Sequence, residues 1–292
     1  MAQIREIKKR IVAVRTIRRI TKTMQMIATA KFTASLSRAK AGRPYMERIR
    51  QLVAEVAARA GDTSHPLCMP QPKPSKRELI LVVSSDRGLC GAYNGHIFRS
   101  ALKAIKASAA AGNHVEVEVV GKKALAFLKF QKIAVAQRHV FGDKPQFAQV
   151  EPLAQRLIDD YLAGKFDSCR VVFMQFISAS KQVPEVMQLL PMSLPVAPQT
   201  TAAKSAMGLY EFSPTADELL GELLPRAVKV SLFQAIIDAI VSENVMRMVA
   251  MKSATDNAAG LGRTLHRNYN RARQARITTE LTEIVSGAAA LA

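Results

Sequence analysis

The stretch Ser84–Asn94, with the sequence SSDRGLCGAYN, holds the residues of this chain whose types and spacing come closest to those of an active site. It follows the apolar run LILVV at 79–83 and precedes a segment with helical periodicity, a position where α/β proteins often place active sites. Two kinds of chemistry are conceivable there. Cys90 could act as a nucleophile in a sharp strand-to-helix turn, or the glycines could let the backbone cradle a phosphate.

Both kinds of site lack parts that they require. A nucleophile elbow of the form G-x-C-x-G needs a second glycine at position 92, where this chain has Ala92. The phosphate-binding patterns G-x-G-x-x-G and G-x-x-x-x-G-K-[ST] do not occur. The histidines that could activate a thiol stand singly in the sequence, at His65, His96, His114, His139 and His266. We therefore interpret Cys90 as a buried structural cysteine, and a Cys90-dependent hydrolase stays a minor alternative.

Metal and cofactor sites are also not indicated. His65 and Cys68 form an isolated H-x-x-C with no second pair of ligands. We expect no catalytic residue, no metal and no cofactor. The three cysteines form neither an even disulfide framework nor a C-x-x-C pair, which suits a reducing compartment.

Proline divides the elements that position this turn into three zones, because helix interiors rarely tolerate it. None of the 13 prolines lies before Pro44 or after Pro225. In the middle zone, between about 77 and 212, strand and helix patterns alternate, which predicts a parallel-containing sheet covered by helices. The expected strands are 78–84, 115–120, 135–140 and 169–177, and the expected helices are 93–111, 121–130 and 147–163. The five prolines from Pro184 to Pro214 predict short edge strands and loops.

The two outer zones have helical periodicity. In the first zone we expect a near coiled-coil seam, overwound between Ile11 and Ile20, formed by Ile4, Ile7, Ile11, Val14, Ile17, Ile20, Met24 and Ile27. In the last zone the seam is Phe233, Ile237, Ile240, Asn244, Met248, Met251, Thr255, Ala258, Gly262, Leu265, Tyr269 and Ala272. Each stripe must be covered, and the economical solution packs the two helices on each other. Small residues in the second seam allow close approach but bury little apolar area.

The charge is strongly positive and unevenly distributed. The formal net charge is +19, and residues 1–50 hold 14 basic side chains against the acidic pair Glu6 and Glu47. Such a surface predicts an acidic partner, which could be nucleic acid, anionic lipid or protein. Nucleic acid and a merely solvated basic face are about equally favoured, since aromatic residues make up only 5% of the chain and Trp is absent. A basic coiled-coil module that binds nucleic acid is therefore the alternative function.

Targeting and membrane segments are not indicated. The basic N-terminus lacks the apolar core of a signal peptide, and no stretch reaches the roughly 18 unbroken apolar residues of a membrane helix. We expect a folded protein of the cytoplasm.

Four strings resemble the gamma subunit of the bacterial and organellar rotary ATP synthase, and they occur in the family's order along the whole chain. They are ITKTMQMIATAKF (20–32), SDRGLCGAYN (85–94), SENVMRMVAMKSATDNA (242–258) and YNRARQARITTELTEIVSGAAA (269–290). The resemblance implies a long antiparallel coiled coil of the terminal helices plus a central Rossmann-like α/β domain. The implied segments are an N-terminal shaft helix (1–60), a linker (61–76), the central domain (77–215) and a C-terminal shaft helix (216–292).

The resemblance also implies the function. The chain would be a noncatalytic rotor shaft that couples proton-driven rotation of the membrane ring to ATP synthesis on the beta subunits. Its partners would be the alpha and beta subunits, the epsilon subunit and the ring of c subunits, with no nucleic acid and no small-molecule substrate of its own. Its location would be peripheral, on the cytoplasmic face of the bacterial inner membrane.

By the same resemblance, seven residues match positions that contact partners. Lys22 and Met24 match the place where the shaft passes a lever arm of beta, and Arg247 matches their neighbour on the opposite helix. Arg273 and Gln274 match a pair that hydrogen-bonds a loop of beta, and Thr278 and Glu283 match further polar positions. We also hypothesise that a shaft turning inside a ring avoids apolar surface patches and tight ion pairs.

Overall fold

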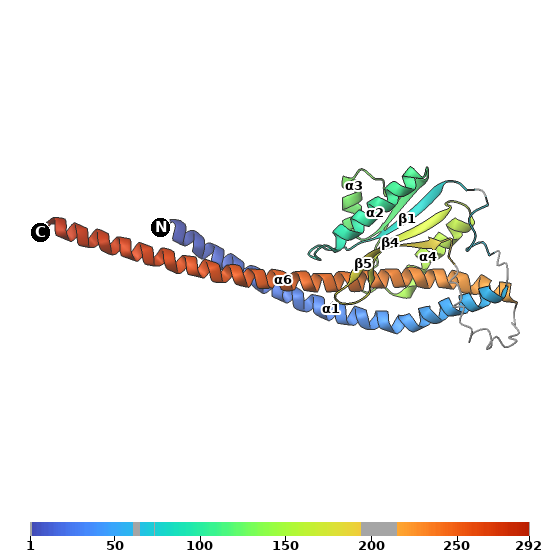
Figure 1. The fold of residues 1–292 in the computed structure, drawn as a ribbon, viewed down its shortest axis with the longest axis horizontal. Helices are drawn as coiled ribbons and strands as arrows, with labels where there is room; N and C mark the ends of the chain where they lie inside the picture. Colours follow the sequence, from blue (N-terminus) through green and yellow to red (C-terminus); the bar gives the residue numbers. More distant parts are fainter. Residues whose placement is uncertain (1, 61–64, 73, 194–214, 292) are drawn as a thin grey trace. The chain divides into compact units, whose positions relative to one another are not determined.

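The computed structural model describes residues 2–60, 65–72, 74–193 and 215–291. They form two compact units. The first unit, which we call the helix pair, consists of residues 1–30 and 247–292; the second, the α/β unit, consists of 31–246. The helices α1 (Ala2–Ala60) and α6 (Ala216–Leu291) each contribute residues to both units (Figure 1).

The α/β unit is built on a five-stranded sheet with the order β3-β2-β1-β4-β5. Its strands are β1 (Arg77–Val83), β2 (His114–Val120), β3 (Gln137–His139), β4 (Ser168–Phe176) and β5 (Gln182–Leu190). The pairs of β1, β2, β3 and β4 are parallel, and β5 is antiparallel to β4. The continuous apolar run of β1 fits this arrangement, because a central parallel strand is buried on both faces.

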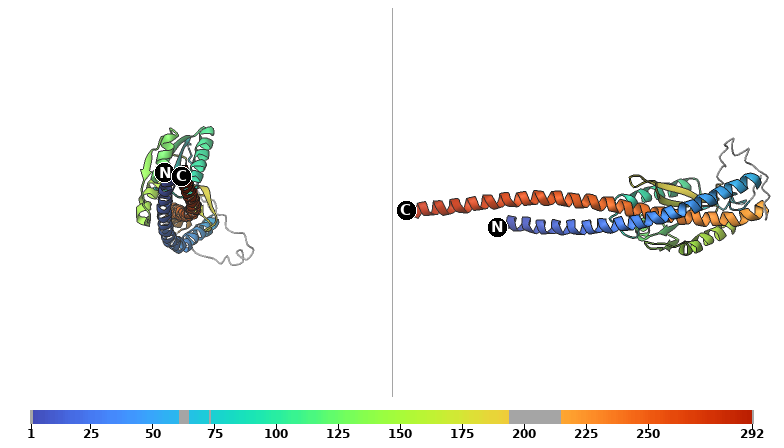
Figure 2. Two further views of the ribbon diagram at one scale, coloured as in Figure 1. Left: turned by 90° about the vertical axis from the view of Figure 1, so that its left-hand side faces the viewer. Right: turned by 90° about the horizontal axis from the view of Figure 1, so that it is seen from below.

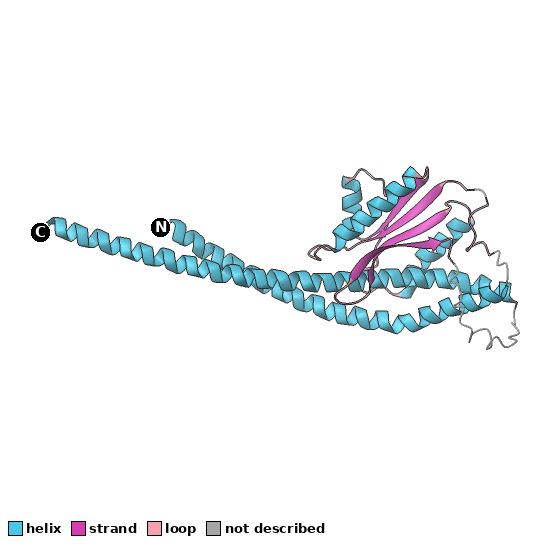
Figure 3. Ribbon diagram, in the orientation of Figure 1, coloured by secondary structure: helices cyan, strands magenta, loops and turns pink. Residues whose placement is uncertain are grey.

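Helices cover both faces of the sheet (Figure 3). On one face α2 (Tyr93–Ala110) and α3 (Lys122–Phe130) pack on Ile80 and Val82. On the other face α4 (Phe147–Leu162) and the portions of α1 and α6 that belong to this unit pack on Leu79 and Leu81. The alternation of side chains along β1 thus separates two cores.

The predicted strands and helices of the middle zone are confirmed to within a few residues. The segment after Pro184 differs from expectation in part. β5 is an edge strand, as predicted, but it is nine residues long rather than short. Pro184 is compatible with it because a strand at the edge of a sheet can leave one backbone nitrogen unpaired. The rest of the proline-rich segment, 194–214, lies outside the described residues.

The segment 65–72 is anchored to the α/β unit. Leu67 is buried in the core of the α/β unit, and its carbonyl accepts a hydrogen bond from the Met192 N–H at 2.8 Å. The Tyr161 hydroxyl donates to the Met69 carbonyl at 2.6 Å, and the Gln71 side chain donates to the Tyr161 carbonyl at 2.5 Å. These contacts fix this part of the chain against α4.

The helix pair is antiparallel (Figures 1 and 2). The Thr255 Oγ1 lies 2.9 Å from the Thr21 Oγ1. A Cβ added at Gly262, seven residues later on α6, would lie 3.9 Å from Val14, seven residues earlier on α1. The C-terminal end of α6 extends past the N-terminal end of α1 (Figure 2). From Ile277 to Ala289 every side chain is exposed.

The seam on α1 differs from the prediction after Val14. Ile17, Ile20 and Ile27 are about half exposed, and Thr21 and Ala28 are buried instead. On α1, the buried and half-buried positions of the helix pair follow two seven-residue ladders, apart from Met24, which is half-buried as predicted. The ladders are Ile4, Ile11 and Gln25, and Ile7, Val14, Thr21 and Ala28. The predicted run of three-residue steps was wrong, because it followed the large β-branched residues where the seam uses small ones. The predicted seam on α6 from Met248 to Ala272 is confirmed, since all its members are buried or half-buried.

Candidate partner-binding surfaces

The turn after β1 is closed by its own side chains. The Asp86 carboxylate accepts the Lys122 N–H at 3.0 Å, and the Ser84 hydroxyl oxygen accepts the Ala124 N–H at 2.9 Å. These two N–H groups belong to the first turn of α3, which is where a phosphate binds when a helix start forms a cradle. The protein therefore uses these donors internally.

Gly121 makes this close arrangement possible. Its φ is 92°, in the left-handed region that favours glycine, and an added Cβ would lie 2.4 Å from the Ser84 carbonyl oxygen. Only a glycine lets the start of α3 approach the end of β1 so closely.

Cys90 is buried, as predicted, with 2% of its surface exposed. The Asn94 amide donates to its sulfur at 3.2 Å, and the Ser85 hydroxyl lies 3.8 Å away. None of the hydrogen bonds described at Cys90 involves a histidine or a carboxylate. Cys90 therefore acts as a small, largely apolar side chain that packs between the start of α2 and the end of β1.

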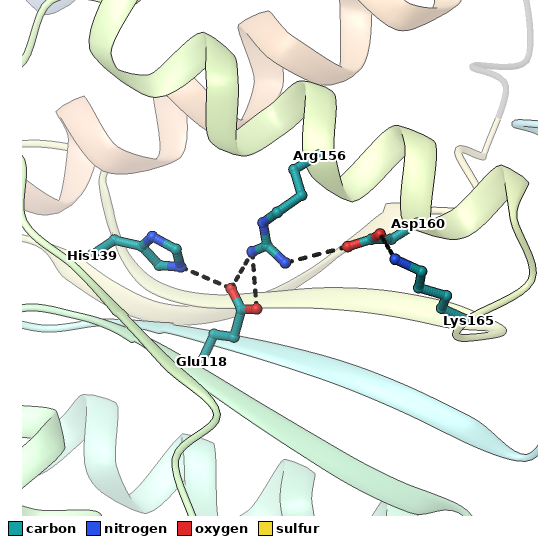
Figure 4. Close-up of polar contacts among 5 residues, drawn as sticks. All are labelled: Glu118, His139, Arg156, Asp160 and Lys165. Carbon is teal, nitrogen blue, oxygen red and sulfur yellow. Dashed lines mark hydrogen bonds and ion pairs between the residues drawn. The ribbon is translucent and has the colours of Figure 1, made fainter.

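A buried charge network on the other face of the sheet was missed at the sequence level (Figure 4). The Glu118 carboxylate, 1% exposed, accepts hydrogen bonds from Arg156 at 2.6 and 2.9 Å and lies 2.8 Å from His139 Nε2. Arg156 also pairs with Asp160 at 3.3 Å, and Asp160 pairs with Lys165 at 2.6 Å. The sequence of β2, HVEVEVV, contained a signal for this network. It places the charged Glu118 among the apolar residues of a buried strand, where a carboxylate needs a partner.

The pKa shifts in this network indicate a structural role, in which the charged groups connect elements of the fold. Burial raises the pKa of Glu118, but hydrogen bonds from His139 and Arg156 outweigh it and hold that pKa below its usual value. Burial, and then the negative charge of Glu118, raise the pKa of the fully buried Cys169, which therefore stays a neutral thiol. The network connects β2, β3 and α4 and presents no reactive thiolate to a substrate.

The first group of predicted contact residues lies on the helix pair, on both helices. Lys22 is exposed and its Nζ lies 3.5 Å from the Gln25 Oε1. Met24 and Arg247 are half-buried. The structure contains no partner chain, so the roles of these three residues stay predictions.

The second group lies near the C-terminal end of α6. Arg273, Gln274, Thr278 and Glu283 are all exposed. Gln274 and Thr278, four residues apart, share a face of the helix, and the Thr278 hydroxyl donates to the Gln274 carbonyl at 3.1 Å. Glu283 lies about 140° further around the helix from Thr278, so the four residues do not form one patch. Their roles also stay predictions.

An exposed apolar stripe on α1 was not predicted. Ile17, Ile20 and Ile27 are each a little over 50% exposed, and Met24 continues the same face. The helical spacing of three or four residues places these four side chains side by side. The hypothesis that the shaft avoids apolar surface patches is therefore wrong for this helix. The helix has more apolar residues than its seam buries, and the remaining ones are exposed.

No group of three or more His, Cys, Asp or Glu side chains is placed to hold a metal ion within the described ranges. None of the helices of this part of the chain is long and apolar enough to cross a membrane.

The structure is similar to chains of solved mitochondrial ATP synthases. The rotor chain of the Euglena gracilis mitochondrial ATP synthase superposes with a TM-score of 0.63 at 18% identity, covering 94% of this chain and 99% of that chain. A chain of the Tetrahymena thermophila mitochondrial enzyme, from its central stalk and c-ring, superposes with a TM-score of 0.57 at 21% identity, covering 80% of this chain and 99% of that chain. These likenesses confirm the fold that was predicted: a long terminal helix pair with a central α/β domain.

Sequence comparisons define the family. A family model described as ATP synthase matches residues 3–291. The ATP synthase gamma chain of Rhodopirellula baltica is 40% identical over 295 residues, which cover 100% of this chain and 99% of that one. The gamma chain of Geobacter metallireducens is 38% identical over 289 residues, covering 99% and 98%. The chain therefore belongs to the family of ATP synthase gamma chains.

Proposed function

We propose that this gamma chain is the noncatalytic rotor shaft of an ATP synthase, coupling proton-driven rotation of a membrane ring to ATP synthesis on the beta subunits. The observation that carries the proposal is full-length identity of up to 40% to bacterial gamma chains. The antiparallel helix pair supports it, because two helices packed along their length resist bending better than one.

The absence of catalysis by this chain is supported by its central domain. In the strand-to-helix turn that resembles an active site, Ser84 and Asp86 accept hydrogen bonds from the start of α3, and Cys90 is buried. A substrate phosphate bound at the start of α3 would have to displace both of these hydrogen bonds. Catalysis is therefore assigned to the partner ring, and this chain transmits force.

The partners proposed are the alpha and beta subunits around the helix pair, the epsilon subunit and the ring of c subunits. The exposed side chains of Ile17, Ile20 and Ile27, with the half-buried Met24 on the same face, support a protein partner rather than nucleic acid, because contiguous apolar surface favours protein interfaces. Lys22 and Arg247 are proposed to contact the same partner. Arg273, Gln274, Thr278 and Glu283 are proposed to contact the ring near the end of α6. The proposed location is peripheral, on the cytoplasmic face of a bacterial inner membrane.

The test is coexpression with the alpha and beta subunits of the same organism, followed by purification and reconstitution with the membrane ring. We expect an assembly with one copy of this chain that hydrolyses ATP and pumps protons into vesicles. Removal of residues 270–292 should lower proton pumping per ATP hydrolysed, because it removes Arg273, Gln274, Thr278 and Glu283.

The control is Cys90→Ser, which leaves the shaft intact. It should leave both ATP hydrolysis and pumping near the wild-type level. Loss of hydrolysis in this variant, with the assembly intact, would contradict the noncatalytic assignment. Retention of the full chain on DNA, with no assembly with alpha and beta, would favour the nucleic-acid alternative.

A further inference from the structure

A groove in the helix pair contains a concentration of positive charge that the seam does not require. Its volume is about 850 Å³, and it is lined from α1 by Ile11, Val14, Arg15 and Arg18. From α6 it is lined by residues 258–260, Gly262, Arg263, Thr264, His266 and Arg267. Four arginines and one histidine therefore converge from two helices on one groove.

Arg18 explains why the seam opens there. It lies seven residues after Ile11 and seven before Gln25, on one of the two ladders that form the α1 seam. A guanidinium at such a position cannot be buried without a partner, and Arg18 is exposed. The α6 residues that line the groove include Ala258 and Gly262, which are too small to fill the space.

The arginines of the groove lack a carboxylate partner among the residues that the structure describes. The chain has no acidic residue between Glu6 and Glu47, nor between Asp256 and Glu280. Among the described residues, no carboxylate pairs with Arg15, Arg18 or Arg263. Within the described part of the chain, the hydrogen bond of Arg267 goes to the Thr264 hydroxyl, at 3.4 Å. Four unneutralised cations around one hollow attract a ligand with several negative charges.

We propose that this groove binds a linear chain of phosphates, such as tripolyphosphate or the triphosphate of a nucleotide. Arginine rather than lysine supplies the cations, and its planar fork of donors matches phosphate oxygens in pairs. The volume lies in the range of small-ligand sites. The lining contains no Phe, Tyr or Trp to stack on a base, so the phosphate chain carries the recognition.

The experiment uses the full-length chain and isothermal titration calorimetry with sodium tripolyphosphate, at fixed ionic strength and without magnesium. We expect one site per chain, with ATP binding no more tightly than tripolyphosphate. Arg18→Gln and Arg263→Gln should each weaken tripolyphosphate binding about tenfold, the loss of one charge-assisted contact. Circular dichroism checks that each variant keeps its helices.

Matched controls separate the groove from general charge. Arg19→Gln and Arg271→Gln remove the same charge from the same helices at exposed positions that do not line the groove. They should leave the affinity within about twofold of wild type, because an exposed guanidinium that does not line the groove makes no direct contact with the ligand and is screened by solvent. The proposal is overturned if tripolyphosphate does not bind, or if these controls weaken binding as much as Arg18→Gln does. It is also overturned if only an acidic peptide or an oligonucleotide binds. None of these outcomes alters the rotor assignment, whose test is coupling in the assembly.

Discussion

The α/β unit and the helix pair reach their stability by different means. In the α/β unit, large side chains such as Tyr161, Leu157 and Ile80 are almost fully buried between sheet and helices. In the helix pair, the buried residues among those described include only two large ones, Ile11 and Met251, which keep 8% and 5% of their surface exposed. Since hydrophobic stabilisation scales with the apolar area removed from water, the α/β unit carries its own stability, whereas the helix pair depends more on partners.

Removal of a large buried side chain from the α/β unit should lower the free energy of unfolding more than any other change considered. The same kind of truncation in the helix pair should have a much smaller effect. Leu157→Ala on α4, where Leu157 is 0% exposed, should lower the free energy of unfolding by about 2–5 kcal/mol through lost burial and a cavity. Urea denaturation followed by circular dichroism measures it. Leu261→Ala on α6, where the side chain is 51% exposed, is the matched control and should cost well under half as much. Equal losses of unfolding free energy in the two variants would contradict the conclusion that the α/β unit relies more on a buried core than the helix pair does.

A buried carboxyl should make the stability of the α/β unit depend on pH. Burial raises the pKa of Asp238 to about 6, although the hydrogen bond from Gln234 and the charge of Arg43 lower it; Glu185 raises it further. Because the folded state then holds the proton more tightly than the unfolded state, stability falls as the pH rises from about 4 to about 6.

The size of this fall is about 3 kcal/mol at most, from a pKa difference of about two units. Asp238→Asn should remove that slope in urea denaturation series at pH 4, 5, 6 and 7. Asp256→Asn, an exposed site on α6, should leave the slope as in wild type. An unchanged slope in Asp238→Asn would show that the carboxyl is not the titrating group.

The close approach at the start of α3 gives a third test. Gly121→Ala should cost about 2 kcal/mol, since its Cβ would meet the Ser84 carbonyl and its φ is 92°. Gly112→Ala, with φ 81° and open space around the Cβ, isolates the strain and should cost about 1 kcal/mol. Thermal denaturation compares the two variants. Equal costs would show that the contact with Ser84 contributes nothing.

The smallest effect is expected in the helix pair. Thr21→Val and Thr255→Val remove the hydroxyls that meet at 2.9 Å in the seam. A double-mutant cycle should give a coupling of about 0.5–1.5 kcal/mol, typical of one hydrogen bond. Hydrogen exchange resolved by peptide reports it in 2–30 and 247–275 without interference from the α/β unit. A coupling several times larger would contradict the conclusion that the seam of the helix pair contributes less stability than the core of the α/β unit.

The sequence predicted the α/β unit better than the helix pair for a physical reason. Runs such as LILVV in β1 and the alternation of strand and helix patterns depend on local periodicity, which the fold preserves. On α1, the choice between Ile20 and Thr21 as the seam residue depends on the partner helix. The prediction chose the more hydrophobic residue, but the fold buries Thr21 against Thr255.

The charged residues of the α/β unit show the same limit. Glu118, His139 and Arg156 come from three separate elements, and no spacing in the sequence connects them. Cys90, in contrast, was predicted as buried because its neighbours lacked the partners that a reactive thiol needs. The seven contact residues transferred from the family are accessible or half-buried, but their partners lie outside this chain, so the fold alone leaves their roles untested.

The seven-residue spacing of both seams has a mechanical consequence. A strict heptad repeat makes two helices wind around each other with a left-handed sense. Torque applied in one direction tightens such a two-stranded rope and presses Thr21 toward Thr255, while torque in the other direction loosens it. The torsional stiffness of the helix pair therefore depends on the direction of the torque. A motor built on this pair would twist elastically by different amounts when it is driven forward and backward.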